Sequence, residues 1–122
     1  MSAPTPHTLL VHARALLVGR WTTHAPARNN AGTPLVLPAA PDAATFSLLG
    51  AVRRAAAREE VDMDSRTGLA AVKALRSALG NTQRGVEGAH REIADWCDVD
   101  GRTEVQVLEV LDRAIAATGR PQ

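Results

Sequence analysis

"LLGAVRRAA", residues 48–56, carries apolar side chains at positions i, i+1, i+4, i+7 and i+8 of its window. On an α-helix these positions share one face, whereas a half-buried strand needs an apolar residue at every second position. The residues concerned are Leu48, Leu49, Val52, Ala55 and Ala56. The segment therefore predicts an amphipathic helix that buries this face against other elements.

The same template returns along the chain at residues 9–17, 71–79, 89–97 and 107–115. The copy at 89–97 is weaker because it includes His90, Trp96 and Cys97. The residues between the template positions do not match from copy to copy, so the pattern is a recurrent helix face and not a sequence repeat. Alanine, leucine and valine dominate the apolar residues and aromatics are few, which favours helices over a β-sandwich.

Residues that start and stop helices stand at the ends of these segments. Thr5 followed by Pro6 suits the start of the first helix. Thr103 with Gln106 three residues later forms a capping box before the last helix. We expect further starts at Asp42 and at Ser65 or Asp64, and ends at Gly19, at Gly80 or Asn81, and at Gly119. The sequence therefore predicts an all-α fold, a compact bundle of four to five helices in one domain over residues 1–122, with 119–122 as a tail.

Residues 22–41 depart from the helical pattern. Four prolines, an Asn-Asn pair and Gly32 are incompatible with a regular helix, so we expect a long Pro-rich loop between the first two helices. Residues 35–37 are apolar and can form a short extended segment lying on the bundle. A loop of this length is either functional or mobile, and both interpretations stay open.

Composition and charge exclude several classes of function. The formal net charge is +1 and arginines alternate with acidic residues, so we expect no nucleic-acid partner. No apolar run approaches the roughly 18 residues of a membrane span, and His12 with Arg14 interrupts the first apolar stretch, which argues against a signal peptide. The single cysteine excludes an internal disulfide. We expect a cytoplasmic protein with no membrane partner, no metal site and no cofactor.

The stretch "DWCDVDGRTEVQ", residues 95–106, holds the candidate site residues. A calcium loop fails there, because Trp96 and Val107 would occupy positions that need acidic ligands. His90 and Cys97 share a helix face but lie about 10 Å apart along it, too far for a nucleophilic pair. One interpretation makes this stretch a capped joint in which Asp98 caps or pairs with Arg102. The other makes Asp98 and Arg102 the polar groups of a ligand pocket.

In the pocket interpretation, Trp21 and Trp96 supply apolar walls around Asp98 and Arg102. These four residues are the candidate ligand-binding set, and Asp98, Arg102 and His90 are the candidate catalytic residues. The alternative for each tryptophan is a core anchor, and for His90 and Cys97 it is packing within the apolar face.

Several segments together resemble a known family. They are Trp21-Thr22 after a first helix, "LLGA" at 48–51, Trp96-x-Asp98 followed by Gly-Arg-Thr at 101–103, and "DRAI" at 112–115. The chain resembles an uncharacterised family of small helical proteins from actinobacteria and their phages, a domain of unknown function. The family pattern has cysteine and asparagine where this chain has Ser47 and Cys97. The resemblance implies a helical fold and a shared signature, and no activity.

Two classes of function stay open. The first is a small non-enzymatic helical accessory protein that binds a protein partner or a second copy of itself, as a possible homodimer. We interpret the charged residues after Val52 as the solvated face of the second helix or a partner surface; they are Arg53, Arg54, Arg58, Glu59 and Glu60. The second class is a small-molecule-binding protein or small acid-base enzyme of specialised metabolism, with its pocket near Trp21, Trp96, Asp98 and Arg102.

Overall fold

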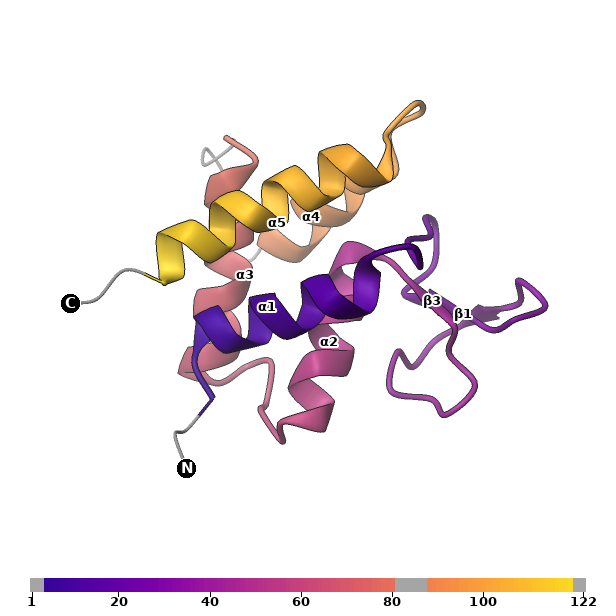
Figure 1. The fold of residues 1–122 in the computed structure, drawn as a ribbon, viewed down its shortest axis with the longest axis horizontal. Coiled ribbons are helices and arrows are strands. Elements are labelled where there is room, and N and C mark those ends of the chain that lie inside the picture. The colour runs from indigo at the N-terminus through magenta and orange to yellow at the C-terminus, as the bar shows by residue number, and fades with distance from the viewer. Residues whose placement is uncertain (1–3, 81–87, 120–122) are drawn as a thin grey trace.

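The computed structural model describes residues 4–80 and 88–119. Within these ranges it contains five α-helices: α1 (Pro6–Leu17), α2 (Leu48–Arg58), α3 (Arg66–Ala78), α4 (Ala89–Cys97) and α5 (Glu104–Thr118). Three short strands lie between the first two helices: β1 (Ala27–Arg28), β2 (Pro34–Leu35) and β3 (Thr45–Phe46). Figure 1 shows α1 and α5 side by side, with the strands at one end of the helical body.

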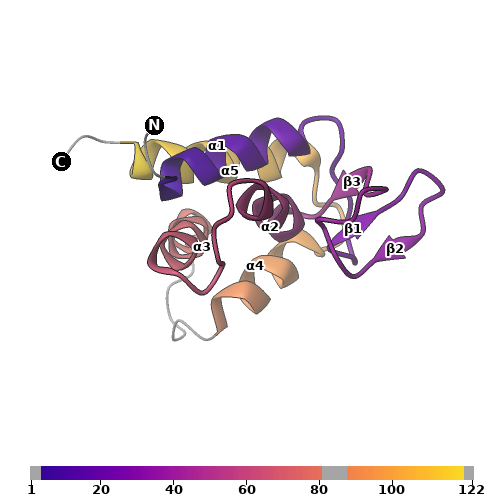
Figure 2. The ribbon, with the colours of Figure 1, turned by 90° about the horizontal axis from the view of Figure 1, so that it is seen from below.

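The helices pack as the recurrent apolar face predicts. Helix α2 contacts α1 on one side and α4 on another, while α3 contacts α1, α4 and α5. Figure 2 shows α1 and α5 above, α2 and α3 beneath them, and α4 lowest. All five template residues of α2 are buried, and each of the other helices buries at least three of its own. The predicted bundle is therefore confirmed among the described residues.

The helix starts follow local capping chemistry. The predicted capping boxes are both present, Thr5 with Thr8 at α1 and Thr103 with Gln106 at α5. Ser65 caps α3 as predicted. The expected start at Asp42 is wrong, because residues 45–46 stay extended in β3 and Ser47 caps α2 instead. The predicted end at Gly80 is consistent with its left-handed φ of +80°, while Asn81 lies outside the described residues.

The all-α expectation is wrong in part, because residues 27–46 form a small antiparallel sheet with strand order β2-β1-β3. Ala27 pairs with Leu35 on one side and with Phe46 on the other. A turn makes this possible: the Asn29 carboxamide accepts backbone N–H groups of Ala31 and Thr33. The sheet is too short to leave an alternating pattern in the sequence, and the fold is mostly helical with this one addition.

The strands are attached to the helical body through buried side chains and backbone bonds. Ala27 and Phe46 are buried in the core, and the Phe46 N–H donates to the Arg20 carbonyl. The expected extended segment at 35–37 is only partly present: Leu35 belongs to β2, while Val36 and Leu37 are 84% and 68% exposed. Segment 22–41 is thus attached to the helical body at Ala27 and forms the strands β1 and β2, while Val36 and Leu37 stay exposed.

Segment 22–41 approaches α2 closely where the Pro26 carbonyl contacts the first turn of that helix. The Ser47 N–H donates to Pro26 O at 3.1 Å, and the Ser47 hydroxyl accepts the Gly50 N–H at 2.9 Å. A Cβ on Gly50 would stand 1.8 Å from Pro26 O and 2.8 Å from its carbonyl carbon. Only glycine fits here without moving backbone, so Gly50 sets how near segment 24–26 lies to α2.

We predict that Gly50→Ala destabilises the fold by on the order of 3 kcal/mol, because backbone atoms on both sides must separate to admit the methyl group. Urea unfolding followed by circular dichroism measures the free energy of unfolding. At a helical glycine with free space around it, the same substitution would raise the free energy of unfolding, since alanine is favoured over glycine in a helix by about 1 kcal/mol. A stabilised Gly50→Ala variant would therefore contradict the close approach.

A buried ion pair joins α3 to α4. Arg76 Nε donates to Glu92 Oε2 at 3.1 Å, and both side chains are more than nine-tenths buried. Among the described residues, Arg76 Nη2 and Glu92 Oε1 have no hydrogen-bond partner. Desolvation of two charges with incomplete pairing leaves little net stabilisation, but loss of one partner strands the other charge in the core.

Because of this asymmetry, we predict that Arg76→Met alone costs roughly 3 kcal/mol of unfolding free energy, as Glu92 is left buried and uncompensated. The double variant Arg76→Met/Glu92→Leu should return to within about 1 kcal/mol of the wild-type protein. Chemical denaturation of the single and double variants measures both effects. Equal destabilisation by the single and the double change would show that the pair itself contributes the stability.

Candidate functional site

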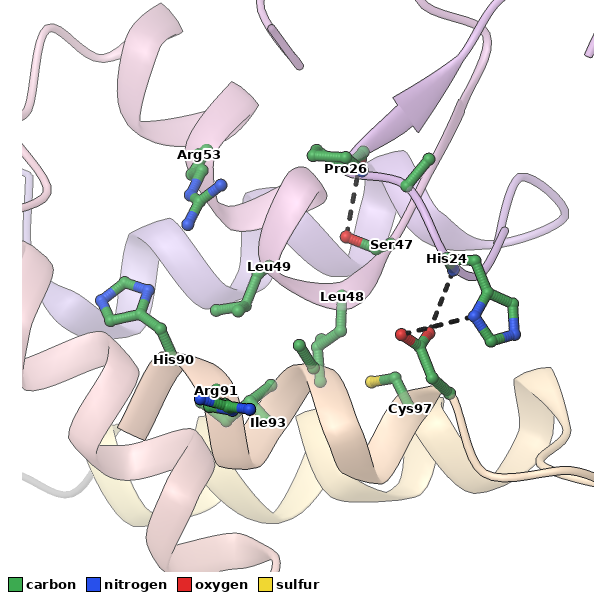
Figure 3. Close-up of a pocket in the computed structure, with 13 residues that line it drawn as sticks. His24, Pro26, Ser47, Leu48, Leu49, Arg53, His90, Arg91, Ile93 and Cys97 are labelled. Carbon is green, nitrogen blue, oxygen red and sulfur yellow. Dashed lines mark hydrogen bonds and ion pairs between the residues drawn. The ribbon is translucent and has the colours of Figure 1, made fainter. Parts of the chain in front are cut away.

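A groove of about 450 Å³ lies between α2 and α4, with the segment 24–26 at one end. We call it the α2/α4 groove. Its lining residues are His24, Ala25, Pro26, Ser47, Leu48, Leu49, Arg53, His90, Arg91, Ile93, Ala94, Cys97 and Asp98. Figure 3 shows α2 above the groove, α4 below it and His24 at the end opposite His90. Its polar groups therefore gather at two separate ends.

The floor of the groove is apolar and belongs to the core. Leu48 and Leu49 come from the first turn of α2, and Ile93 and Cys97 come from α4. All four are buried, with at most 7% of each residue exposed. They are template positions of their helices, so the same apolar faces that fold the bundle also line the groove. Leu49 and Cys97 keep a little accessible surface for a ligand, whereas Leu48 and Ile93 support them from beneath.

One end of the groove is basic. Arg53 reaches it from α2, while His90 and Arg91 reach it from the start of α4 (Figure 3). Burial, and then the nearby Arg53, lower the pKa of His90, while Asp64 opposes them. The imidazole is therefore mainly neutral at pH 7. Its Nδ1 is buried and has no hydrogen-bond partner among residues 4–80 and 88–119.

The arginines of this end differ in their partners. Arg91 lies 4.0 Å from Asp95 in an exposed i,i+4 pair, a contact that contributes little. Arg53 is half-buried and forms no hydrogen bond or ion pair with the described part of the chain. Among the described residues of the groove, Arg53 is thus the cation without a protein partner.

The other end of the groove is closed by Asp98 and His24. Asp98 follows the last residue of α4, and its Oδ1 accepts the His24 backbone N–H at 3.0 Å. Its Oδ2 lies 3.7 Å from Nδ1 of the same histidine. His24 has a left-handed φ of +63°, which is uncommon outside glycine, and the Asp98 contact helps to hold it. Asp98 therefore fastens the segment 24–26 to α4.

Cys97 lies beside Asp98 but is not chemically activated. Burial raises the pKa of its thiol to about 12, and the adjacent Asp98 acts in the same direction. Thiolate is then scarce at physiological pH, whereas a nucleophilic cysteine needs a lowered pKa. The prediction that Cys97 packs as a small apolar residue is confirmed by its burial.

The structure does not bring the four predicted ligand-binding residues together. Asp98 and His90 line the α2/α4 groove, whereas Trp96 and Arg102 lie at a separate small cleft against α5. Arg102 Nε donates to the Trp96 carbonyl at 2.9 Å, and its guanidinium stacks 3.8 Å from the Trp96 ring centroid. Trp21 bridges to Phe46 beside the sheet. Asp98 and Arg102 thus bind different partners instead of each other.

His24, Ser47 and Arg53 line the groove although the sequence does not predict them as site residues. The sequence places Arg53 on a solvated face or a partner surface, yet it lies four residues after Leu49 and therefore at the edge of the buried face. The four-residue spacing from Leu49 is therefore a signal in the sequence that Arg53 lies beside the buried face of α2. His24 and Ser47 carried none, because they reach the groove only through the contacts of segment 24–26 with α2 and α4.

The chain matches one family model over residues 1–117, described as a family of unknown function (DUF6197). The chain belongs to this family. The predicted membership in a family of unknown function is thereby confirmed, while the origin in actinobacteria and phages and the residue signature stay predictions. DUF6197 membership carries no activity with it. Comparison with curated proteins and with solved structures gives no match.

The described part of the DUF6197 chain shows no metal cluster and no membrane-spanning helix. Within residues 4–80 and 88–119, no three His, Cys, Asp or Glu side chains gather as a metal site would require. Over the same part of the chain, every helix is too short or too polar to cross a membrane. The α2/α4 groove therefore stands as the candidate site on its own lining residues.

We predict that Cys97 in the folded protein reacts with iodoacetamide at pH 8 at least about a thousandfold more slowly than the same cysteine in a short peptide. The expected ratio follows from the thiolate populations at pKa values of about 12 and 9.0, and burial adds to it. Mass spectrometry of the single alkylation site gives both rates. Equal rates would mean that Cys97 is exposed and reactive, and would contradict its interpretation as a packing residue.

Proposed function

We propose that this protein binds a small organic molecule in the α2/α4 groove. The observation that carries the proposal is the combination of a buried apolar floor with separate polar groups at its two ends. Small-molecule sites have this composition, and about 450 Å³ lies within their usual range of volumes. The groove also uses residues of three separate elements, α2, α4 and the segment 24–26, that the fold holds in place.

The arrangement supports binding more than acid-base catalysis. Asp98 and His90 lie eight residues apart on or beside α4, which corresponds to roughly 12 Å along a helix. Two groups so far apart cannot hydrogen-bond to the same reacting atom. Asp98 is in addition occupied by His24, and the thiol of Cys97 stays protonated. The enzyme alternative would rest on His90 alone.

We further propose a second role, binding of a protein partner or of a second copy, at a cytoplasmic location. The observation that favours it is the exposed apolar pair Val36 and Leu37 next to the edge strand β2. An edge strand with exposed apolar neighbours offers unpaired backbone groups to another chain. This role is independent of the groove, whose lining includes no residue of 27–46.

We predict that the neutral dye N-phenyl-1-naphthylamine binds the wild-type protein with increased fluorescence, because its fused rings fit an apolar floor. Ala94 is an exposed residue on the rim of the groove, so Ala94→Trp should fill the groove without disturbing the core. We expect this change to raise the dissociation constant of the dye by about tenfold or more.

The matched control is Ala116→Trp, which places the same side chain on the exposed surface of α5, away from the groove. It should leave dye binding unchanged, and thermal melts should show both variants folded. Absence of dye binding to the wild-type protein would refute the proposed function. Equal loss in both variants would place the dye somewhere other than the α2/α4 groove.

A further inference from the structure

We propose that the ligand of the α2/α4 groove is a slender organic monocarboxylate, held with its carboxylate at Arg53, His90 and Arg91 and its apolar body along Leu49 and Ala94 toward Cys97. This inference rests on the proposed function and adds the chemical class and the orientation of the ligand. It is carried by charge complementarity and by the apolar lining between the two ends of the groove.

The charges of the groove are divided between its ends. The basic end carries Arg53 and Arg91 around His90, whereas the other end carries the carboxylate of Asp98 (Figure 3). The start of α4 adds the positive end of a helix dipole on the same side as the arginines. An anionic head group is attracted to the His90 end and repelled from the Asp98 end. The groove thus selects a single negative charge and one direction of binding.

The Arg53 guanidinium favours a ligand that brings hydrogen-bond acceptors to this end. It faces the groove from α2 (Figure 3) and has no ion pair within the described residues. A carboxylate offers it two oxygens, which match the two parallel N–H donors of a guanidinium. An alcohol offers only one oxygen and no charge, so it cannot accept this pair of charge-assisted bonds.

The shape of the floor determines the body of the ligand. Between His90 and Cys97 the groove is lined by apolar side chains over roughly 10 Å of α4. An extended chain of about eight carbons or a small ring system spans this length. The ligand cannot reach far beyond Cys97, because Asp98 and His24 close that end with their hydrogen bond. A compact anion such as acetate would contact the basic end alone and leave the floor uncovered.

The test is a set of two-dimensional ¹H–¹⁵N NMR titrations of the full chain with octanoate, octan-1-ol and acetate at 0.15 M salt. We expect octanoate to bind with a dissociation constant about tenfold below that of octan-1-ol, and acetate to bind much more weakly than either. Arg53→Gln should remove the preference for octanoate while leaving octan-1-ol unchanged. Arg58→Gln changes the net charge equally on the same helix, outside the groove lining, and should alter neither ligand.

The outcomes separate this inference from the proposed function. Equal binding of octanoate and octan-1-ol to the wild-type protein would overturn the monocarboxylate proposal while keeping a small-molecule groove. Equal effects of Arg53→Gln and Arg58→Gln would overturn the role of Arg53, since the preference would then reflect overall charge. Binding of N-phenyl-1-naphthylamine without binding of octanoate would likewise refute the ligand class alone, whereas failure of both would refute the proposed function as well.

Discussion

The contact between the first turn of α2 and the Pro26 carbonyl is the constraint on which the rest of the structure depends. Ser47 caps the helix and donates its own N–H to Pro26 O, and Gly50 leaves the space that this carbonyl occupies. A Pro-rich segment far from α2 in the sequence is thereby fixed against it. Segment 24–26 consequently acts as an end wall of the α2/α4 groove, while β1 continues from it into the sheet.

Two further contacts position α4 relative to this wall. The buried pair of Arg76 and Glu92 joins α4 to α3 near its start, and Asp98 joins the other end of α4 to His24. Between these points α4 faces α2 across the groove with Ile93 and Cys97 on the floor. The geometry of the site thus follows from three contacts that also hold the fold together. Changes in ligand binding must therefore be compared with stability in each variant.

The helices could be predicted because their signals are local. The apolar template and the caps at Thr5, Ser65 and Thr103 involve residues within one or two turns of each other. The sheet could not be predicted from the sequence, because its two-residue strands are too short for a periodic pattern. They also depend on pairing between Ala27 and the distant Phe46. The start at Asp42 failed for the same reason, since β3 keeps the chain extended up to Ser47.

The candidate site was predicted in part, and the errors have a common cause. Asp98 and His90 were identified from residue type and do line the groove. Their assumed neighbours Trp96 and Arg102 are close in sequence, but the end of α4 directs them to the opposite side, where they stack on each other. Trp96 and Arg102 are thus close to Asp98 along the chain without sharing its groove. His24 enters the site only through tertiary contacts, which one sequence does not reveal, whereas Arg53 lies at the edge of a helix face that the sequence does reveal.

The most direct test of the account is the orientation of octanoate in the complex, measured by intermolecular nuclear Overhauser effects with the isotope-labelled protein. We expect contacts from the protons beside the carboxylate to His90 and Arg53, and contacts from the terminal methyl group to Cys97. Reversed contacts, with the methyl group at His90, would contradict the division of charge on which the ligand assignment is based. Contacts outside the α2/α4 groove would contradict the assignment of the site.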